Sequence, residues 1–173
     1  MDADLTKQVF TKTFKKMLND YPFSKITISK LCNTCNMNRT SFYYHFQDKY
    51  DMVCWIYDRD MAKICKDGFN DNREFVKAVA TYFYDNRDFY RKVFTFTGDN
   101  PFSIHLKEQM RNVLNDYLLE TICTDNNLDF YRIFFEDAII CSVERWLNED
   151  NCMLPEKYLS LIESCLHISE DKE

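Results

Sequence analysis

Apolar residues recur along most of the chain at steps of three to five positions, the spacing that places them on one face of an amphipathic helix. The first such run covers residues 4–20, with lysines between the apolar positions, and ends before Pro22. Further helices are expected to begin at Thr27, Asn38 and Asp48, because these residue types cap helix N-termini well. The first fifty residues are therefore predicted to form three helices and to start a fourth.

The rest of the chain continues the helical pattern. The fourth helix is expected to close near Gly68, and an aromatic-rich segment over residues 71–97 is interrupted at Asp85-Asn86-Arg87. Further helices are predicted over residues 103–123, 129–148 and 156–168, the last begun by Pro155 in its first turn. Since the chain has only two Gly and three Pro in 173 residues, a turn-rich β fold is disfavoured. The predicted fold class is all-α.

The glycine and cysteine positions also limit the chemistry of the chain. The glycines, Gly68 and Gly98, are too few and too far apart for a dinucleotide-binding G-x-G-x-x-G or a phosphate loop. Cys32 and Cys35 have the spacing of half a zinc site, but no second pair follows, and buried apolar thiols are the ordinary interpretation. We therefore expect no metal and no cofactor.

The second and third predicted helices form a helix-turn-helix candidate, since both are short and only a few turn residues separate them. A tight turn between helices requires one residue with a positive φ, where Gly fits best and Asn second, and Asn36 stands at that position. In the third helix Phe42 and Phe46 are four residues apart and can pack inward together. This leaves a polar and aromatic set to face outward, Arg39, Thr40, Ser41, Tyr43, Tyr44 and His45.

The outward set suits the major groove of double-stranded DNA. Arg can bridge guanine O6 and N7, Thr can contact a thymine methyl group, and Tyr or His can reach phosphate. The alternative is a polar face whose aromatics cover a neighbouring domain. Charge favours DNA, because residues 1–50 carry a net charge of +4 whereas the whole chain carries −6. Chance segregation of surface charge would give the same asymmetry.

Residues 27–49, TISKLCNTCNMNRTSFYYHFQDK, resemble the DNA-binding signature of the TetR family of bacterial regulators. The longer stretch FYYHFQDKYDMVCWIY is similar to regulators of the dihydroxyacetone-kinase operon type. The resemblance implies a head over residues 1–50, joined through the fourth helix to an effector-sensing and dimerisation body over 51–173. It implies phosphate contacts by Thr27, Tyr43, His45 and Lys49, base contacts by Arg39, Thr40 and Tyr44, and either role for Ser41.

The resemblance also implies a homodimer in which the last two helices of each copy pack together. From the residues alone, packing inside one chain is an equally good interpretation of those apolar helices. A dimer is expected on functional grounds, because one short recognition helix makes too few base contacts for specific affinity. An unknown small-molecule effector or a protein co-regulator would act on the body. The candidates for a pocket there are Trp55, Tyr82, Tyr90, Phe94 and His105, for each of which an ordinary place in the core is the alternative.

Two other function classes compete with a DNA-binding regulator. An enzyme is disfavoured and no catalytic residue is expected, because the adjacent Glu136 and Asp137 point to different helix faces and no nucleophile motif is visible. A helical protein–protein interaction module that does not bind DNA directly is the alternative. No signal peptide or membrane-length apolar run is visible, so we expect a cytoplasmic protein with no membrane partner.

Overall fold

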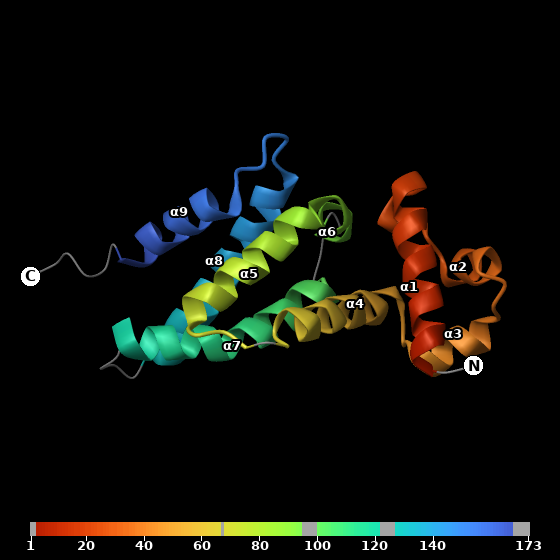
Figure 1. Ribbon diagram of the computed structural model, residues 1–173, viewed down its shortest axis with the longest axis horizontal. Coiled ribbons are helices and arrows are strands. Elements are labelled where there is room, and N and C mark those ends of the chain that lie inside the picture. Colours follow the sequence, from red (N-terminus) through yellow and green to blue (C-terminus); the bar gives the residue numbers. More distant parts are fainter. Residues whose placement is uncertain (1–2, 67, 95–99, 122–126, 168–173) are drawn as a thin grey trace, which may run out of the picture. The chain divides into compact units, whose positions relative to one another are not determined.

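The computed structural model describes residues 3–66, 68–94, 100–121 and 127–167, and within them the regular elements are helices (Figure 1). The all-α fold class is therefore confirmed. The elements are α1 (Ala3–Asp20), the 3₁₀ helix η1 (Phe23–Lys25), α2 (Ile28–Thr34), α3 (Arg39–His45), α4 (Lys49–Ile64), α5 (Asn72–Asp85), α6 (Arg87–Phe94), α7 (Pro101–Thr121), α8 (Leu128–Asn148) and α9 (Pro155–His167).

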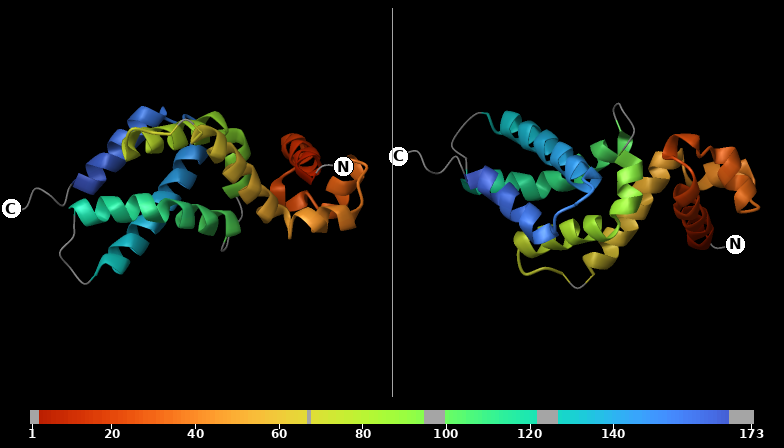
Figure 2. Two further views of the ribbon diagram at one scale, coloured as in Figure 1. Left: turned by 60° about the horizontal axis from the view of Figure 1, so that its bottom comes forward. Right: turned by 90° about the horizontal axis from the view of Figure 1, so that it is seen from above.

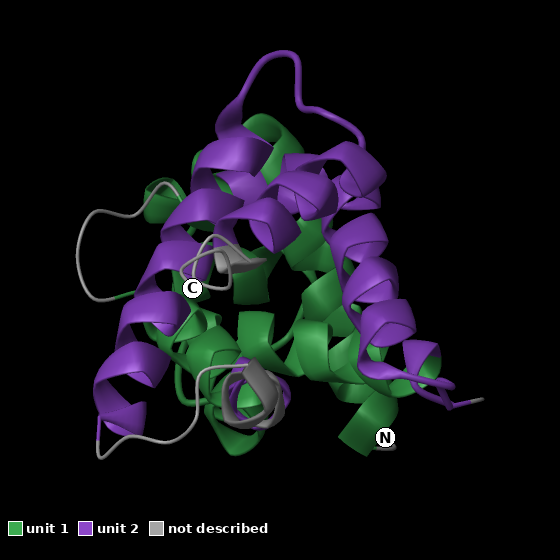
Figure 3. Cartoon of the chain, turned by 90° about the vertical axis from the view of Figure 1, so that its left-hand side faces the viewer, with its two compact units in different colours: residues 1–63, 92–109 green, residues 64–91, 110–173 purple. Residues whose placement is uncertain are grey.

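The helices are grouped in two compact units, which Figure 3 colours separately. The first unit holds residues 1–63 and 92–109, and the second holds residues 64–91 and 110–173. The DNA-reading head expected over residues 1–50 lies within the first unit. The division at residue 50 concerns function rather than compactness, and it stays a prediction.

The first unit has an aromatic core under its three N-terminal helices. The Phe10 ring of α1 meets the Phe42 ring of α3 edge-on at 5.3 Å, and Phe14 meets Phe23 of η1 in the same way at 5.8 Å. All four side chains are buried. Burial of an aromatic ring of this size contributes about 1.5–3 kcal/mol, so these contacts hold α1 and α3 together.

Side-chain caps fix where the short helices begin. The side-chain oxygens of Thr27, Asn38 and Asp48 each accept the backbone N–H three residues later, at 3.2, 2.6 and 2.9 Å. All three caps were predicted from the sequence and are confirmed. Asn36 has a φ of 54°, the left-handed conformation predicted for the turn between α2 and α3. The head is therefore built largely from local signals.

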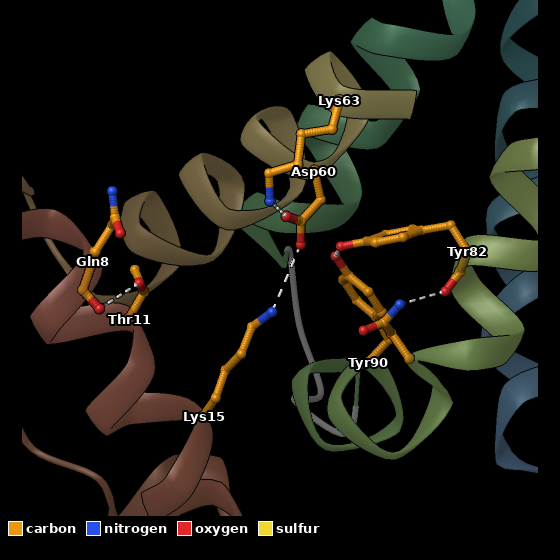
Figure 4. Close-up of polar contacts among 8 residues, drawn as sticks. Gln8, Thr11, Lys15, Asp60, Lys63, Tyr82 and Tyr90 are labelled. Carbon is orange, nitrogen blue, oxygen red and sulfur yellow. Dashed lines mark hydrogen bonds and ion pairs between the residues drawn. The ribbon is translucent and has the colours of Figure 1, made fainter. Parts of the chain in front are cut away.

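The C-terminal end of α1 receives a cation from α6, although its own last turn contains no basic residue. Lys92 Nζ donates a hydrogen bond to the carbonyl of Leu18 at 2.7 Å. A cation at this end satisfies a terminal carbonyl and complements the negative end of the helix dipole. Earlier in α1, Lys15 lies 3.7 Å from the carboxylate of Asp60, which also pairs with Lys63 at 2.7 Å (Figure 4).

In the second unit, α9 packs against α8 through a stacked aromatic pair. The rings of Trp146 and Tyr158 lie 4.1 Å apart and are nearly parallel, at 3°. The indole N–H donates to the carbonyl of Met153 at 2.8 Å, and the Tyr158 hydroxyl donates to Ser142 at 3.1 Å. Both polar tips are thus satisfied, which lets these large side chains be buried at little cost.

Helix α9 also lies beside α5, as Figure 2 shows. The Arg73 guanidinium donates two hydrogen bonds, at 3.1 and 3.0 Å, to the carboxylate of Glu163. Arg91, the last residue of the segment 64–91 of the second unit, donates to the carbonyls of Leu147 and Glu149 at 2.9 and 3.2 Å. These two bonds satisfy backbone carbonyls at the C-terminal end of α8.

Candidate nucleic-acid interface

The turn before α3 sets the direction of that helix. The Met37 N–H donates to the carbonyl of Cys32 at 2.9 Å, and the Cys35 N–H donates to the carbonyl of Leu31 at 3.1 Å. With Asn36 in the left-handed conformation between them, the chain reverses in three residues. Leu31 and Cys32 are buried, so the turn is anchored to the core of the head.

The inner face of α3 is fixed by its two phenylalanines. Phe42 and Phe46 are both buried, and their ring centroids lie 5.6 Å apart. This is the inward pairing predicted from their four-residue spacing. Because an α-helix is a rigid element, anchoring one face fixes the direction of the opposite face.

The outer face of α3 presents polar and aromatic side chains to solvent. Tyr44 is 82% exposed and Tyr43 is 50% exposed, with Arg39 and Thr40 exposed beside them. The Arg39 guanidinium donates to the Tyr43 hydroxyl at 3.4 Å, and this hydrogen bond raises the pKa of Arg39. His45 is half-buried and meets the Tyr44 ring edge-on at 4.9 Å.

All six α3 candidates are thus carried by one short helix. Ser41 lies half-buried at the base of the outer face, and its N–H is the one that Asn38 caps. Thr27 is exposed at the start of α2, and its hydroxyl oxygen accepts the Lys30 N–H. That bond leaves the Thr27 hydroxyl proton to donate to an acceptor such as phosphate.

Lys49 is oriented toward the loop that precedes Thr27. Its Nζ donates to the carbonyls of Phe23 and Ile26 at 2.8 and 3.3 Å, and it lies 4.3 Å from the Phe23 ring centroid. Desolvation by burial lowers the pKa of Lys49. An ammonium group has three N–H donors, and two of them bond the chain itself. Lys49 therefore helps to position the start of α2, a role that the sequence pattern did not indicate.

Two of the five predicted effector residues lie together in one pocket. Trp55 and His105 line a depression of about 580 Å³ in the first unit. Phe94 is buried instead, with its ring 5.5 Å from that of Phe102 in the same unit. Tyr82 and Tyr90 belong to the second unit, where their hydroxyls are 2.6 Å apart (Figure 4).

The sequence interpretation missed the acidic residues of this pocket. Asp51, Asp58 and Glu108 belong to its lining, and Asp58 lies 2.6 Å from His105 Nε2. The signal that could have found two of them is the seven-residue spacing of Asp51 and Asp58, which places both on one face of a helix.

Other candidate chemistry has structural explanations in the described residues. Burial raises the pKa of both Cys32 and Cys35, so neither thiol is activated. Buried Glu136 pairs with Arg132 at 3.1 Å and with Arg111 at 3.5 Å. Among the residues that the structure places, no three His, Cys, Asp or Glu side chains are grouped to hold a metal ion. In the same part of the chain, no helix is both long and apolar enough to cross a membrane.

Comparison with known proteins gives consistent matches. A TetR-type family model described as "Transcriptional regulator C-terminal region" matches residues 70–167, more than half of the chain. The HTH-type dhaKLM operon transcriptional activator DhaS of Lactococcus lactis subsp. lactis (strain IL1403) is 27% identical over 71 residues. That alignment covers 41% of this chain and 36% of DhaS, so the chain spans about a third of this relative's length.

Two solved structures share the fold. One is described as dihydroxyacetone kinase operon activator DhaS; it matches with a TM-score of 0.65 at 21% identity, over 94% of this chain and 97% of its own. The other is a TetR transcriptional regulator from Streptococcus agalactiae 2603V, with a TM-score of 0.71 at 21% identity, over 95% of this chain and 94% of its own. At this level of identity the two structures bear on the fold alone.

Proposed function

Because the chain belongs to the TetR family of transcriptional regulators, we propose that it is a homodimeric, sequence-specific DNA-binding protein that reads a palindromic operator. The observation that carries this proposal is the outer face of α3. There an Arg, a Thr and two exposed Tyr side chains stand on a helix whose opposite face is buried. Such a helix can enter the major groove without changing its own structure.

The proposed roles divide the residues between base edges and phosphates. Arg39, Thr40 and Tyr44 contact base edges, and Ser41 contacts either a base or a phosphate. Phosphate contacts come from Thr27, Tyr43, His45 and Lys49. For Lys49 this leaves one N–H for the phosphate, because the other two bond the carbonyls of Phe23 and Ile26.

We further propose that the second copy packs on the outer face of α8. Phe130, Ile133 and Phe134 lie one helical turn apart on this face and are 66%, 51% and 56% exposed. Three neighbouring large apolar side chains in water favour burial against a protein surface. A two-fold dimer would bury the same patch twice and would present two copies of α3 to two half-sites.

Control of DNA binding would come from the body. A small-molecule effector or a protein co-regulator would bind there, and the pocket that contains Trp55 and His105 is the proposed place for a small molecule. We propose no catalytic activity and place the protein in the cytoplasm, where its DNA target would be.

Selection of bound duplexes from a randomised pool tests the proposal. We expect enrichment of an inverted repeat, bound with an affinity that falls steeply as salt rises. Lys49→Ala should reduce the salt slope by about one, whereas Lys66→Ala, which removes an exposed lysine in the turn after α4, should leave the slope unchanged. If folded dimer enriches no sequence, the helical protein–protein interaction module replaces the proposed function.

A further inference from the structure

The pocket in the first unit combines Gln47, which lies between α3 and α4, with residues of α4 and of the first half of α7. Its lining is Gln47, Asp51, Cys54, Trp55, Asp58, Pro101, Ile104, His105 and Glu108. Its volume of about 580 Å³ is in the range of small-molecule sites. Every lining residue belongs to the same compact unit, so the pocket has a defined geometry.

The pocket is acidic. Asp51 and Asp58 come from α4 and Glu108 from α7, whereas no Lys or Arg is found among the described residues of the lining. The imidazole of His105 also lines the pocket, and its Nε2 lies 2.6 Å from a carboxylate oxygen of Asp58. The negative potential is felt by Cys54, whose pKa is raised to about 12, first by burial and then by Asp58, Asp51 and Asp48. A ligand in this pocket should therefore be cationic.

The two α4 carboxylates have a fixed separation along the helix. Asp51 and Asp58 are seven residues apart, which is about two turns and about 10 Å of rise on one face. Between them lie the lining residues Cys54 and Trp55, which present a thiol and an indole rather than a charge. This order, acid–apolar–acid, matches a ligand with two cationic ends and an apolar stem.

The first turn of α7 offers little to an anion. The helix begins at Pro101, which has no N–H, and the Phe102 N–H donates to the buried side chain of Asn100 at 3.0 Å. The exposed side chain of Ile104 adds apolar surface to this wall of the pocket. The α7 wall thus suits a methylene chain better than a phosphate or carboxylate.

The indole ring of Trp55 already has two cationic side chains of the chain itself beside it. Arg59 lies 5.2 Å and Lys7 lies 5.5 Å from the Trp55 ring centroid, both within cation–π distance. The cationic ends of a ligand should therefore be held by the carboxylates, with Trp55 as apolar surface beside its stem.

We propose that this pocket binds a linear aliphatic diamine or polyamine, with one ammonium group at Asp51, a second at Asp58, and Glu108 supplying further acceptor oxygens. Binding itself is a property of the pocket. Any regulatory effect of that binding rests on the proposed function. It would act through Gln47, which directly follows Phe46, the C-cap residue of α3. The Gln47 N–H donates to the Asp51 carboxylate at 2.8 Å, so a ligand at Asp51 acts on the residue that links α3 to α4.

Isothermal titration calorimetry of the full chain without DNA tests the proposal, with 1,7-diaminoheptane as the probe and 1-aminoheptane as its singly charged match. We expect one diamine per chain, bound at least about tenfold more tightly than the monoamine, since one additional charge-assisted hydrogen bond is gained. Equal affinities for the two amines, or no binding at millimolar concentration, would overturn the proposal.

Variants locate the binding site. Asp51→Asn keeps an acceptor oxygen for the Gln47 N–H, and Glu108→Gln changes an exposed side chain, so both proteins should fold. Each is expected to weaken diamine binding about tenfold. Asp150→Asn, an exposed site in the second unit with the same change in net charge, should change the affinity less than about twofold. An equal effect at all three positions would show non-specific charge attraction and refute the site.

The two proposals fail in different ways. Duplex selection on the same preparation, without amine, reports DNA binding alone. A chain that enriches an operator but fails the calorimetric test keeps its proposed function and loses this pocket assignment. A chain that binds the diamine at Asp51 and Glu108 but enriches no duplex keeps the pocket and loses the proposed function.

Discussion

Among the side chains that the structure describes, exposed aromatic residues within helices lie on α3 and α8, and their surroundings differ. On α3, Tyr43 and Tyr44 stand among hydroxyl and guanidinium groups, and Arg39 bonds the Tyr43 hydroxyl. On α8, Phe130 and Phe134 stack against each other with ring centroids 6.3 Å apart, beside the exposed Ile133. Exposure is similar in the two places, but the chemistry is not.

The difference indicates what each surface binds. A tyrosine among polar groups keeps hydrogen-bonding capacity along with its apolar ring, which fits a charged and hydrated partner such as DNA. A phenylalanine cluster has no such capacity and gains free energy only when water is removed from it, as in a protein interface. The neighbours of an exposed ring are thus more informative than its exposed area.

The largest test of this comparison places charge on the α8 surface. The double change Phe130→Asp and Phe134→Asp should raise the dimer dissociation constant at least about 100-fold, because a carboxylate replaces each of two rings per copy that the proposed interface would bury. Sedimentation velocity measures this, with circular dichroism to establish that the helices persist. The matched control is Leu5→Asp, at another exposed apolar residue, on α1. A dimer that survives the double change would show that α8 is not the interface.

The next test concerns the polar surface. Arg39→Ala should cost about 1–3 kcal/mol on the selected operator and relax the preference at one base pair, while hardly changing affinity for random duplex. Competition binding against single-base variants of the operator measures this. The same loss on specific and random DNA would instead make Arg39 a phosphate contact.

A third test uses the pH dependence of stability to probe the contact between Tyr158 of α9 and the inner side of α8. Burial raises the pKa of Tyr158 to about 12, although its hydrogen bond with Ser142 acts in the opposite direction. The folded pKa exceeds the unfolded one, so this stabilisation is complete below pH 10 and is lost as pH rises toward 12. By pH 11 the loss should be about 1 kcal/mol. Urea unfolding of Tyr158→Phe beside the parent should show a shallower decline over this range, with no change in dimer dissociation at neutral pH.

The smallest effect is expected at the turn that directs α3. Asn36→Ala should lower the free energy of unfolding by about 0.5–1 kcal/mol, because alanine adopts a positive φ less readily than asparagine. Asn36→Gly is the control and should be close to neutral. Thermal unfolding measures both, and equal stability of the two variants would mean that the turn relaxes to another conformation.

Local signals made most of the fold predictable. Thr27, Asn38 and Asp48 each cap the helix that follows them, and the break between α5 and α6 lies at Asn86, within the expected stretch Asp85-Asn86-Arg87. Each of these features depends on contacts within a few residues along the chain, which sequence spacing reports directly. Pairing of Phe42 with Phe46 was predictable for the same reason.

Contacts between distant residues were not predictable in this way. Trp55 and His105 share a pocket, whereas Tyr82 and Tyr90 pair with each other in the second unit. All were simply aromatic or imidazole residues at helical spacing, and nothing in that spacing specifies which helix lies opposite. Lys49 illustrates the same limit, because its two carbonyl partners lie 26 and 23 residues earlier in the chain.

The stacked pair of Trp146 and Tyr158 gives the second unit its own fluorescent label. The chain has two tryptophans, and the other, Trp55, lies in the first unit. Trp146 is buried against a parallel ring, so its emission should be shifted to the blue and quenched by iodide less than that of the half-exposed Trp55. Trp146→Phe therefore leaves a chain whose tryptophan emission reports on the first unit alone, and Trp55→Phe leaves one whose tryptophan emission reports on the second.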